Sequence, residues 1–184
     1  MWLMIYGEAI LHDLLNNGAD ILKSFSCMKL ETDINRFIEA QDIPYFCGYK
    51  QALEEVKNGK KINHWIWYIF PQLRCLGRSS RAHYYGIADK AEAERYLNNQ
   101  ILGSRIREIT EVLLAHRDKT ALEIFGEIDA IKVRSCMTMF DYLSPRDIFS
   151  EVLDSFYKSE RCELTLKVMQ KNEYEGINLK KKRL

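Results

Sequence analysis

The sequence predicts an all-α fold, a compact single-domain bundle of about seven to nine short helices. Apolar residues recur at spacings of three and four along most of the chain, and capping residues precede several of these runs. No Asn-Gly or Asp-Gly hairpin signal lies between alternating segments. The 184 residues are enough for one domain with its own core, and 3 Pro and 9 Gly are too few for a turn-rich β-sandwich.

The first two helices of this domain are expected after residue 32. Ile34, Phe37 and Ile38 share one face of the first helix. Asp42-Ile-Pro44 is expected to begin the second, because proline is tolerated in the first turn of a helix. Asn58-Gly59 is expected to end it, since glycine readily adopts the left-handed conformation that follows a helix.

Capping residues mark the later helices. Asp89 with Glu92, and Thr120 with Glu123, have the capping-box spacing, in which each side chain accepts a backbone N–H at the helix start. An apolar stripe predicts a further helix, with Leu102, Ile106, Ile109 and Leu113 on one face. Two more helix starts are expected, one at Asp129 and one at Ser144-Pro145 with Asp147.

Three parts of the chain differ in composition. Residues 1–30 are interpreted as an N-terminal extension with little packing of its own, residues 31–174 as a single α-helical domain, and residues 175–184 as a basic C-terminal tail. Twenty-seven basic and twenty-six acidic residues leave a formal charge of +1. Because net charge gives no case for nucleic-acid binding, we expect no nucleic-acid partner.

The cysteines and the N-terminal stretch bear on location. The five cysteines are widely spaced and include no CxxC pair or zinc-ligand pattern, which favours reduced thiols and no metal site. The apolar start of the chain has no Lys or Arg before it and contains Glu8 and Asp13, unlike a signal peptide. No window reaches the ~18 apolar residues of a membrane-spanning helix. We expect a cytoplasmic protein without a membrane partner and without a cofactor.

One segment departs from the helical pattern. Residues 64–72 read HWIWYIFPQ, an unusual density of aromatic side chains. We expect a short helix that Asn63 caps and that ends at Phe70, because the following proline disfavours helical backbone before it. In one interpretation this is the central core helix. In the other, Trp65 or Trp67 stacks on a ring of a ligand.

An arginine-rich turn follows the aromatic segment. Arg74 and Arg78 lie in it, and Ser79 and Ser80 precede a helix expected at residues 81–85. Guanidinium groups bind phosphate or carboxylate, and a helix start adds free N–H donors. These residues predict an anion site, although neither GxxxxGK[ST] nor GxGxxG is present.

A second polar stretch contains Lys132, Arg134 and Ser135 on a predicted helix. Lys132 and Ser135 are neighbours at i, i+3 beside an apolar stripe. The stretch either closes the anion site from another helix or is a solvated helix face.

These stretches are similar to the motifs of one family. His64-Trp-x-Trp-x-x-Phe-Pro-Gln-Leu and Leu76-Gly77-x-Ser79-Ser80 resemble the signature of the bacterial and fungal domain-of-unknown-function family 1810. Some members carry the label calpastatin, which does not fit so apolar a chain. The resemblance implies a mainly helical fold and no particular reaction. Residues 158–163 replace the Gly and Asp that the family usually has there. Further matches, within residues 33–170, are Tyr85-Gly86-Ile87, Leu102-Gly103-x-Arg105, Ile124-Phe125-Gly126, Lys132-x-Arg134-Ser135-Cys136-Met137-Thr138 and Leu164-Thr165-Leu166.

Two classes of function fit these observations, and the sequence does not decide whether the protein is an enzyme. The first is binding, and processing, of a small phosphate-bearing, nucleotide- or ADP-ribose-like ligand. His64 is then the candidate catalytic residue, because histidine exchanges protons near neutral pH. The second is a non-catalytic interaction module with the aromatic segment as core. The residues expected to bind the anionic ligand are Trp65, Trp67, Gln72, Arg74, Arg78, Ser79, Ser80, Lys132, Arg134 and Ser135.

Overall fold

The structure is a computed structural model that describes residues 33–44 and 47–171. Residue contacts divide the chain into Met1–Asp33 and Ile34–Leu184, and every described helix lies in the second unit. The extension expected at residues 1–30 and the basic tail expected at residues 175–184 lie outside the described residues.

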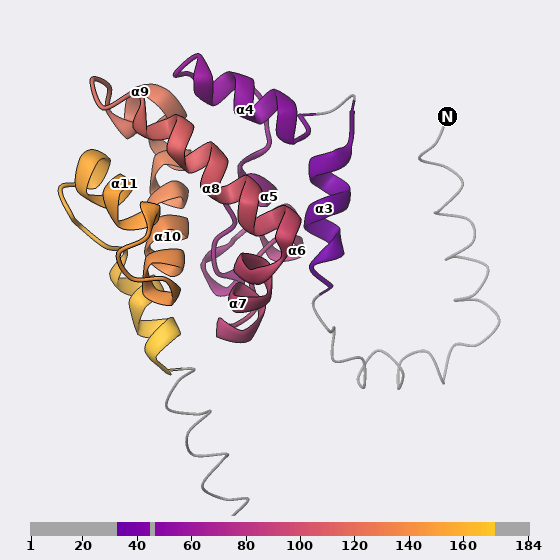
Figure 1. Cartoon of the computed structure of the whole chain (residues 1–184). Coiled ribbons are helices and arrows are strands. Elements are labelled where there is room, and N and C mark those ends of the chain that lie inside the picture. Colours follow the sequence, from indigo (N-terminus) through magenta and orange to yellow (C-terminus); the bar gives the residue numbers. More distant parts are fainter. Residues whose placement is uncertain (1–32, 45–46, 172–184) are drawn as a thin grey trace, which may run out of the picture. The chain divides into compact units, whose positions relative to one another are not determined.

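Helices account for the regular structure of the described residues. The order is α3 (Asn35–Asp42), α4 (Tyr49–Lys57), α5 (Ile66–Ile69), a 3-10 turn η1 (Arg74–Leu76), α6 (Ser80–Tyr84), α7 (Lys90–Asn98), α8 (Gln100–Leu114), α9 (Ala121–Phe125), α10 (Glu127–Leu143) and α11 (Ile148–Tyr157), as Figure 1 shows. Residues 163–171 are also helical. Within this part of the chain the strand-like pairing is one bridge between Leu73 and Ile87. The predicted all-α bundle is confirmed.

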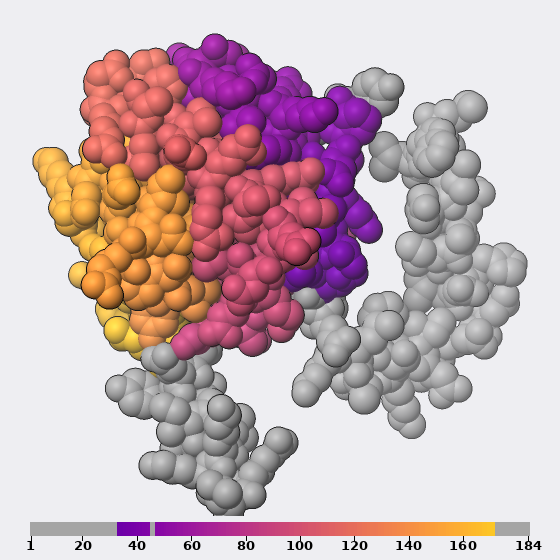
Figure 2. All heavy atoms as spheres, in the orientation of Figure 1, coloured from indigo at the N-terminus to yellow at the C-terminus, as the bar shows by residue number. Residues whose placement is uncertain are grey.

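Helix α8 is the central element of the described unit. It packs against α4, α7 and α11, and α10 packs against α7, α9 and α11 (Figure 1). On the face shown in Figure 2, side chains of α8 meet those of α3 and α4 on one side. The arrangement places the C-terminal end of α3 and the first turns of α4 beside α8.

The core is rich in contacts between aromatic rings. Phe37 meets Tyr96 edge-on with ring centroids 5.0 Å apart, and Tyr96 stacks on Phe140 at 5.5 Å. Trp65 and Phe70 lie 6.2 Å apart, within the same fully buried core. Such pairs each add about 0.5–1.5 kcal/mol beyond the area that they bury. Much of the aromatic segment is therefore structural.

Local capping signals predicted several helix boundaries correctly. Asp89 accepts the Glu92 backbone N–H at 2.8 Å at the start of α7. Thr120 and Glu123 form the expected capping box at the start of α9. Helix α4 ends at Lys57, and Gly59 follows with φ +64°, as the Asn-Gly pair predicted.

Other expected helix starts were wrong. Asp42 is the last residue of α3, not the start of the next helix, because Pro44 holds Ile43 in an extended conformation and so ends α3. Helix α4 begins only at Tyr49. Helix α10 begins at Glu127, with Asp129 inside its first turn.

The remaining two caps also differ from expectation. Asp147 is the N-cap of α11, and the Ser144 hydroxyl donates to the carboxylate of Asp147 at 3.0 Å. Asn63 does not cap α5, because its side chain bonds to Glu55 on α4. The N-cap residue of α5 is Trp65, which makes no side-chain capping bond. A tertiary contact with Glu55 thus replaced the cap expected from Asn63, whereas a local contact between Ser144 and Asp147 accompanies the later start of α11.

Candidate functional site

One buried carboxylate holds the loop before the aromatic segment. Glu55 on α4 accepts bonds from the backbone N–H groups of Ile62 and Asn63 at 2.7 and 3.0 Å, and from Trp65 Nε1 at 2.8 Å. The Asn63 side chain donates another at 2.6 Å. Burial raises the pKa of Glu55, but these four hydrogen bonds outweigh burial and keep the pKa below its usual value. Glu55 is therefore an ionised anchor for the aromatic segment.

Trp67 is half-buried, whereas Trp65 is fully buried. The guanidinium carbon of Arg81 lies 5.4 Å from the ring centroid of Trp67, and Lys132 Nζ lies 5.1 Å from it. Both distances are within the ~6 Å over which an aromatic ring attracts a cation. The aromatic segment, helix α6 directly after the arginine-rich turn, and the second polar stretch thus meet at one side chain. We call Trp67, Arg81 and Lys132 the cation–indole cluster.

Asp129 links this cluster to a second lysine. Its Oδ1 lies 2.7 Å from Lys132 Nζ and its Oδ2 lies 2.8 Å from Lys61 Nζ. Lys61 Nζ in turn lies 5.2 Å from the ring centroid of Trp65. Burial raises the pKa of Asp129, but the hydrogen bonds and charges of both lysines lower it below its usual value. An ionised carboxylate therefore holds two ammonium groups beside two indoles.

Most residues of the arginine-rich turn lie at the surface. Arg78, Ser79 and Ser80 of this turn are exposed. His64, at the start of the aromatic segment, is exposed as well. Ser79 accepts the Ala82 backbone N–H at 3.2 Å, which makes it the N-cap of α6. Because α6 has only five residues, its start supplies little of the dipole expected to attract an anion.

Gln72 and Arg74 are half-buried beside this turn. Arg74 Nε is buried and makes no hydrogen bond with the described residues. Gly77 has extended backbone, with φ −80° and ψ 144°. A Cβ at Gly77 would lie 2.7 Å from the Cβ of Ala82, so glycine is needed for close packing.

Two expected ligand-binding residues are buried by protein contacts. Trp65 has no exposed surface, and its ring N–H bonds to Glu55, so it offers no face to a ligand. Ser135 is 2% exposed and shares a 2.8 Å hydrogen bond with Thr165. This position fits neither a ligand contact nor a solvated helix face. Arg134 is half-buried and pairs with Glu160 at 3.4 Å.

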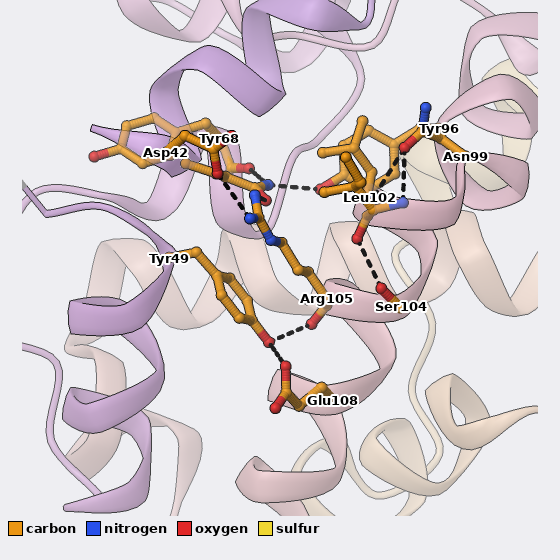
Figure 3. A network of polar contacts seen from close by, with 11 residues as sticks. Asp42, Tyr49, Tyr68, Tyr96, Asn99, Leu102, Ser104, Arg105 and Glu108 are labelled. Atoms are coloured by element: carbon orange, nitrogen blue, oxygen red, sulfur yellow. Dashed lines mark hydrogen bonds and ion pairs between the residues drawn. The ribbon is translucent and has the colours of Figure 1, made fainter. Parts of the chain in front are cut away.

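A cavity of about 740 Å³ opens between α3, α4 and α8. Arg105 reaches from α8 to Asp42 Oδ1 at 2.7 Å and to Gln41 Oε1 at 3.3 Å (Figure 3). The Tyr49 hydroxyl donates to Glu108 Oε2 at 2.6 Å and lies 3.0 Å from the carbonyl oxygen of Arg105. Burial, reinforced by the hydrogen bond and charge of Glu108, raises the pKa of Tyr49, which therefore stays protonated. The cavity wall is a connected polar network.

Sequence reasoning missed this second site. Arg105 belongs to the motif Leu102-Gly103-x-Arg105, but the motif alone does not show that Asp42 and Tyr49 lie beside it. A Cβ at Gly103 would clash with the Leu97 carbonyl oxygen, so this glycine allows the turn between α7 and α8 to close tightly. The signal available in the sequence was an arginine, Arg105, two residues after a glycine of the same motif.

The described residues include neither a metal-binding cluster nor a membrane-spanning helix. No group of three or more His, Cys, Asp or Glu side chains among them is placed to hold a metal ion. None of their helices has both the length and the apolar character required to cross a bilayer.

Known proteins provide two comparisons. Residues 31–169 match the family described as "Protein of unknown function (DUF1810)". The structure is similar to the crystal structure of the conserved hypothetical protein Rv1873 from Mycobacterium tuberculosis, with a TM-score of 0.71 and 34% sequence identity over 76% of this chain and 97% of that chain. No curated protein matches the sequence. The chain therefore belongs to the DUF1810 family, as the motifs around His64 and Lys132 predicted.

Proposed function

We propose that the protein binds a small phosphate-bearing, nucleotide- or ADP-ribose-like ligand at the cation–indole cluster. One observation carries the proposal: Arg81 and Lys132, from separate helices, both lie within 5.4 Å of the centroid of the half-buried Trp67 ring. Cations beside an accessible aromatic surface provide the two groups that a nucleotide needs, donors for phosphate and a flat surface for a ring.

The local charge supports an anionic ligand. Three cations, Lys61, Arg81 and Lys132, surround the two indoles, and Asp129 is the carboxylate bonded to both lysines. These four groups have a surplus of two positive charges. A phosphate monoester carries about −1.5 to −2 charges at pH 7, which matches this surplus.

The proposal concerns binding rather than catalysis. His64 is exposed and makes no hydrogen bond or ion pair with the described residues. A general base usually has a partner that orients its ring, and none of the described residues orients His64. We include a cytoplasmic location in this proposal, because the widely spaced cysteines favour reduced thiols.

Calorimetric titration with ADP-ribose, AMP and inorganic phosphate tests this function. We expect ADP-ribose or AMP to bind more tightly than phosphate, because the ring adds a stacking contribution of about 1–3 kcal/mol. Arg81→Gln and Lys132→Met should each weaken binding about tenfold or more, since a hydrogen bond to a charged group contributes about 1.5–3 kcal/mol.

Arg117→Gln is the matched control, because Arg117 pairs with Glu151 at a site where both side chains are 59% exposed. Binding should be unchanged in this variant. Absence of any heat or thermal shift with all three ligands would exclude the proposal.

A second candidate, a non-catalytic interaction module, has one observation in its favour. Large apolar side chains are exposed close in sequence to Lys61 and Lys132: Ile62 follows Lys61, and Ile128 and Ile131 precede Lys132 on α10. Ile62 and Ile128 are 73% and 71% exposed. If these residues form a contact between copies of the chain, the solution mass measured by light scattering will fall when Ile128 and Ile131 are changed to Lys. An unchanged mass would count against this candidate.

A further inference from the structure

The cavity between α3, α4 and α8 is large enough for a ligand of its own. Its volume of about 740 Å³ lies within the ~300–1,000 Å³ typical of small-molecule sites. Polar side chains from all three helices line it, together with the apolar side chains of Ile43, Pro44 and Leu53. It is formed by residues other than those of the cation–indole cluster, so its ligand is a separate question from the proposed function.

Among the described residues, four charged side chains line this cavity, and their charges sum to zero. Arg105 is paired with Asp42 at 2.7 Å, so these two charges already satisfy each other. Lys50 on α4 and Glu108 on α8 remain, and neither forms an ion pair with the described residues. The lining of the cavity therefore includes one lysine and one glutamate without an ion-pair partner, on different helices, and both residues are exposed to solvent.

The free carboxylate is held in a defined position. Glu108 Oε2 accepts the Tyr49 hydroxyl at 2.6 Å, and Glu108 Oε1 accepts no hydrogen bond from the described residues. Tyr49 is buried, and Figure 3 shows its hydroxyl pointing toward Glu108. One oxygen is thus fixed by the protein, and the other is left to accept a hydrogen bond from a ligand.

The neighbouring guanidinium is equally well supported. Gln41 accepts from Arg105 through Oε1 and donates through Nε2 to the Tyr68 carbonyl oxygen at 2.8 Å. The Arg105 guanidinium carbon also lies 5.1 Å from the Tyr49 ring centroid. Because α3 and α4 both hold this group, the wall of the cavity is preorganised, which lowers the cost of binding.

We propose that this cavity binds a small zwitterion of the amino-acid class. Its ammonium group would donate to Glu108 Oε1, and its carboxylate would lie against Lys50, with the apolar residues of the wall around its side chain. The balanced charge of the cavity disfavours a phosphate monoester, which would leave about two negative charges without partners. It equally disfavours a simple cation, which would leave Lys50 unpaired.

Titration calorimetry with the common free L-amino acids tests this assignment. At least one should bind, and its N-acetyl and amide derivatives, each of which removes one charge, should bind at least about tenfold more weakly. Glu108→Gln keeps an oxygen to accept the Tyr49 hydroxyl while it removes the charge. This variant and Lys50→Met should each weaken binding about tenfold.

The controls are Glu111→Gln and Lys57→Met, which change exposed residues of α8 and α4 outside the cavity lining. Both should bind the amino acid normally. The assignment is overturned if no free amino acid binds the wild-type chain, or if binding survives both Glu108→Gln and Lys50→Met. Arg81→Gln should leave amino-acid binding intact, so failure of the phosphate-ligand proposal is recognised separately.

Discussion

The indole N–H of Trp65 donates a 2.8 Å hydrogen bond to the carboxylate of Glu55. The same oxygen accepts two backbone N–H groups from the loop between them. Trp65 has no exposed surface and Glu55 is 6% exposed, so this network lies in the interior. The arrangement makes Glu55 the residue on which the placement of the aromatic segment depends.

Removal of this carboxylate should be costly. Glu55→Ala leaves the buried Trp65 indole N–H and two part-buried backbone N–H groups without their acceptor. Because an unsatisfied buried donor costs about 1–3 kcal/mol and a part-buried one less, we expect a loss of at least about 2 kcal/mol in the free energy of unfolding. Glu55→Gln retains one oxygen and should cost about half as much. Urea unfolding followed by tryptophan fluorescence measures both. Glu54→Gln, at the exposed neighbouring position, is the control, and a loss below about 1 kcal/mol in Glu55→Ala would contradict the prediction.

The protein should lose stability in acid. The pKa values of Glu55 and Asp129 lie below their usual 4.5 and 3.8 in the folded protein, because hydrogen bonds outweigh burial. The unfolded chain therefore takes up protons first as pH falls. Their contribution is complete above about pH 5 and is lost as pH falls through the lower folded values. Unfolding free energies of wild type and Glu55→Gln should converge as pH falls through the lowered folded pKa of Glu55, and a constant difference would refute the assignment.

Loss of the buried ion pair between α3 and α7 should lower the free energy of unfolding far more than loss of an exposed pair. Arg36 Nη1 lies 2.6 Å from Glu92 Oε1, with side chains 8% and 0% exposed. Arg36→Met leaves an unpaired buried carboxylate and should cost about 3–5 kcal/mol. Lys57→Met removes the partner of Glu54, an exposed pair, and should cost less than about 1 kcal/mol. Denaturant midpoints compare the two, and equal losses would show that burial of Arg36 is not decisive.

The hydroxyl pair of Ser135 and Thr165 should couple α10 to residues 163–171. Each single variant, Ser135→Ala or Thr165→Val, leaves one buried hydroxyl without its partner and should cost about 1–3 kcal/mol. The double variant should cost less than the sum by about 1 kcal/mol, because both hydroxyl groups are then removed. A double-mutant cycle in urea measures this, with exposed Ser104→Ala as control. Strict additivity would mean that the two hydroxyl groups do not interact.

Helix boundaries were predictable where the deciding contact is local. The caps at Asp89 and Thr120 join residues three positions apart, so the sequence contains all the atoms involved. The cap expected at Asn63 failed because its side chain bonds to Glu55 on another helix, whereas near Ser144 the neighbouring Asp147 is the N-cap instead. Capping propensity names the residue type but not the competing acceptor.

The segments that form the candidate site were predictable, but the contacts between them were not. The aromatic segment and the polar stretch at Lys132 were recognisable, but Arg81 rather than Arg74 or Arg78 is the arginine that lies over Trp67. The sequence could not show that Trp65 is buried. In a short segment that is apolar throughout, no periodicity distinguishes the buried face of a helix from the exposed one.

The sequence by itself determined the helical class, the family and the capped starts of α7 and α9. Periodic apolar residues and short-range hydrogen bonds involve residues that are close neighbours in the chain. Tertiary structure alone decided that Lys132 and Arg81 meet Trp67, and that Lys50 and Glu108 line one cavity. The physical reason is that helix packing brings together residues far apart along the chain, and the positions of charges then depend on which helices touch.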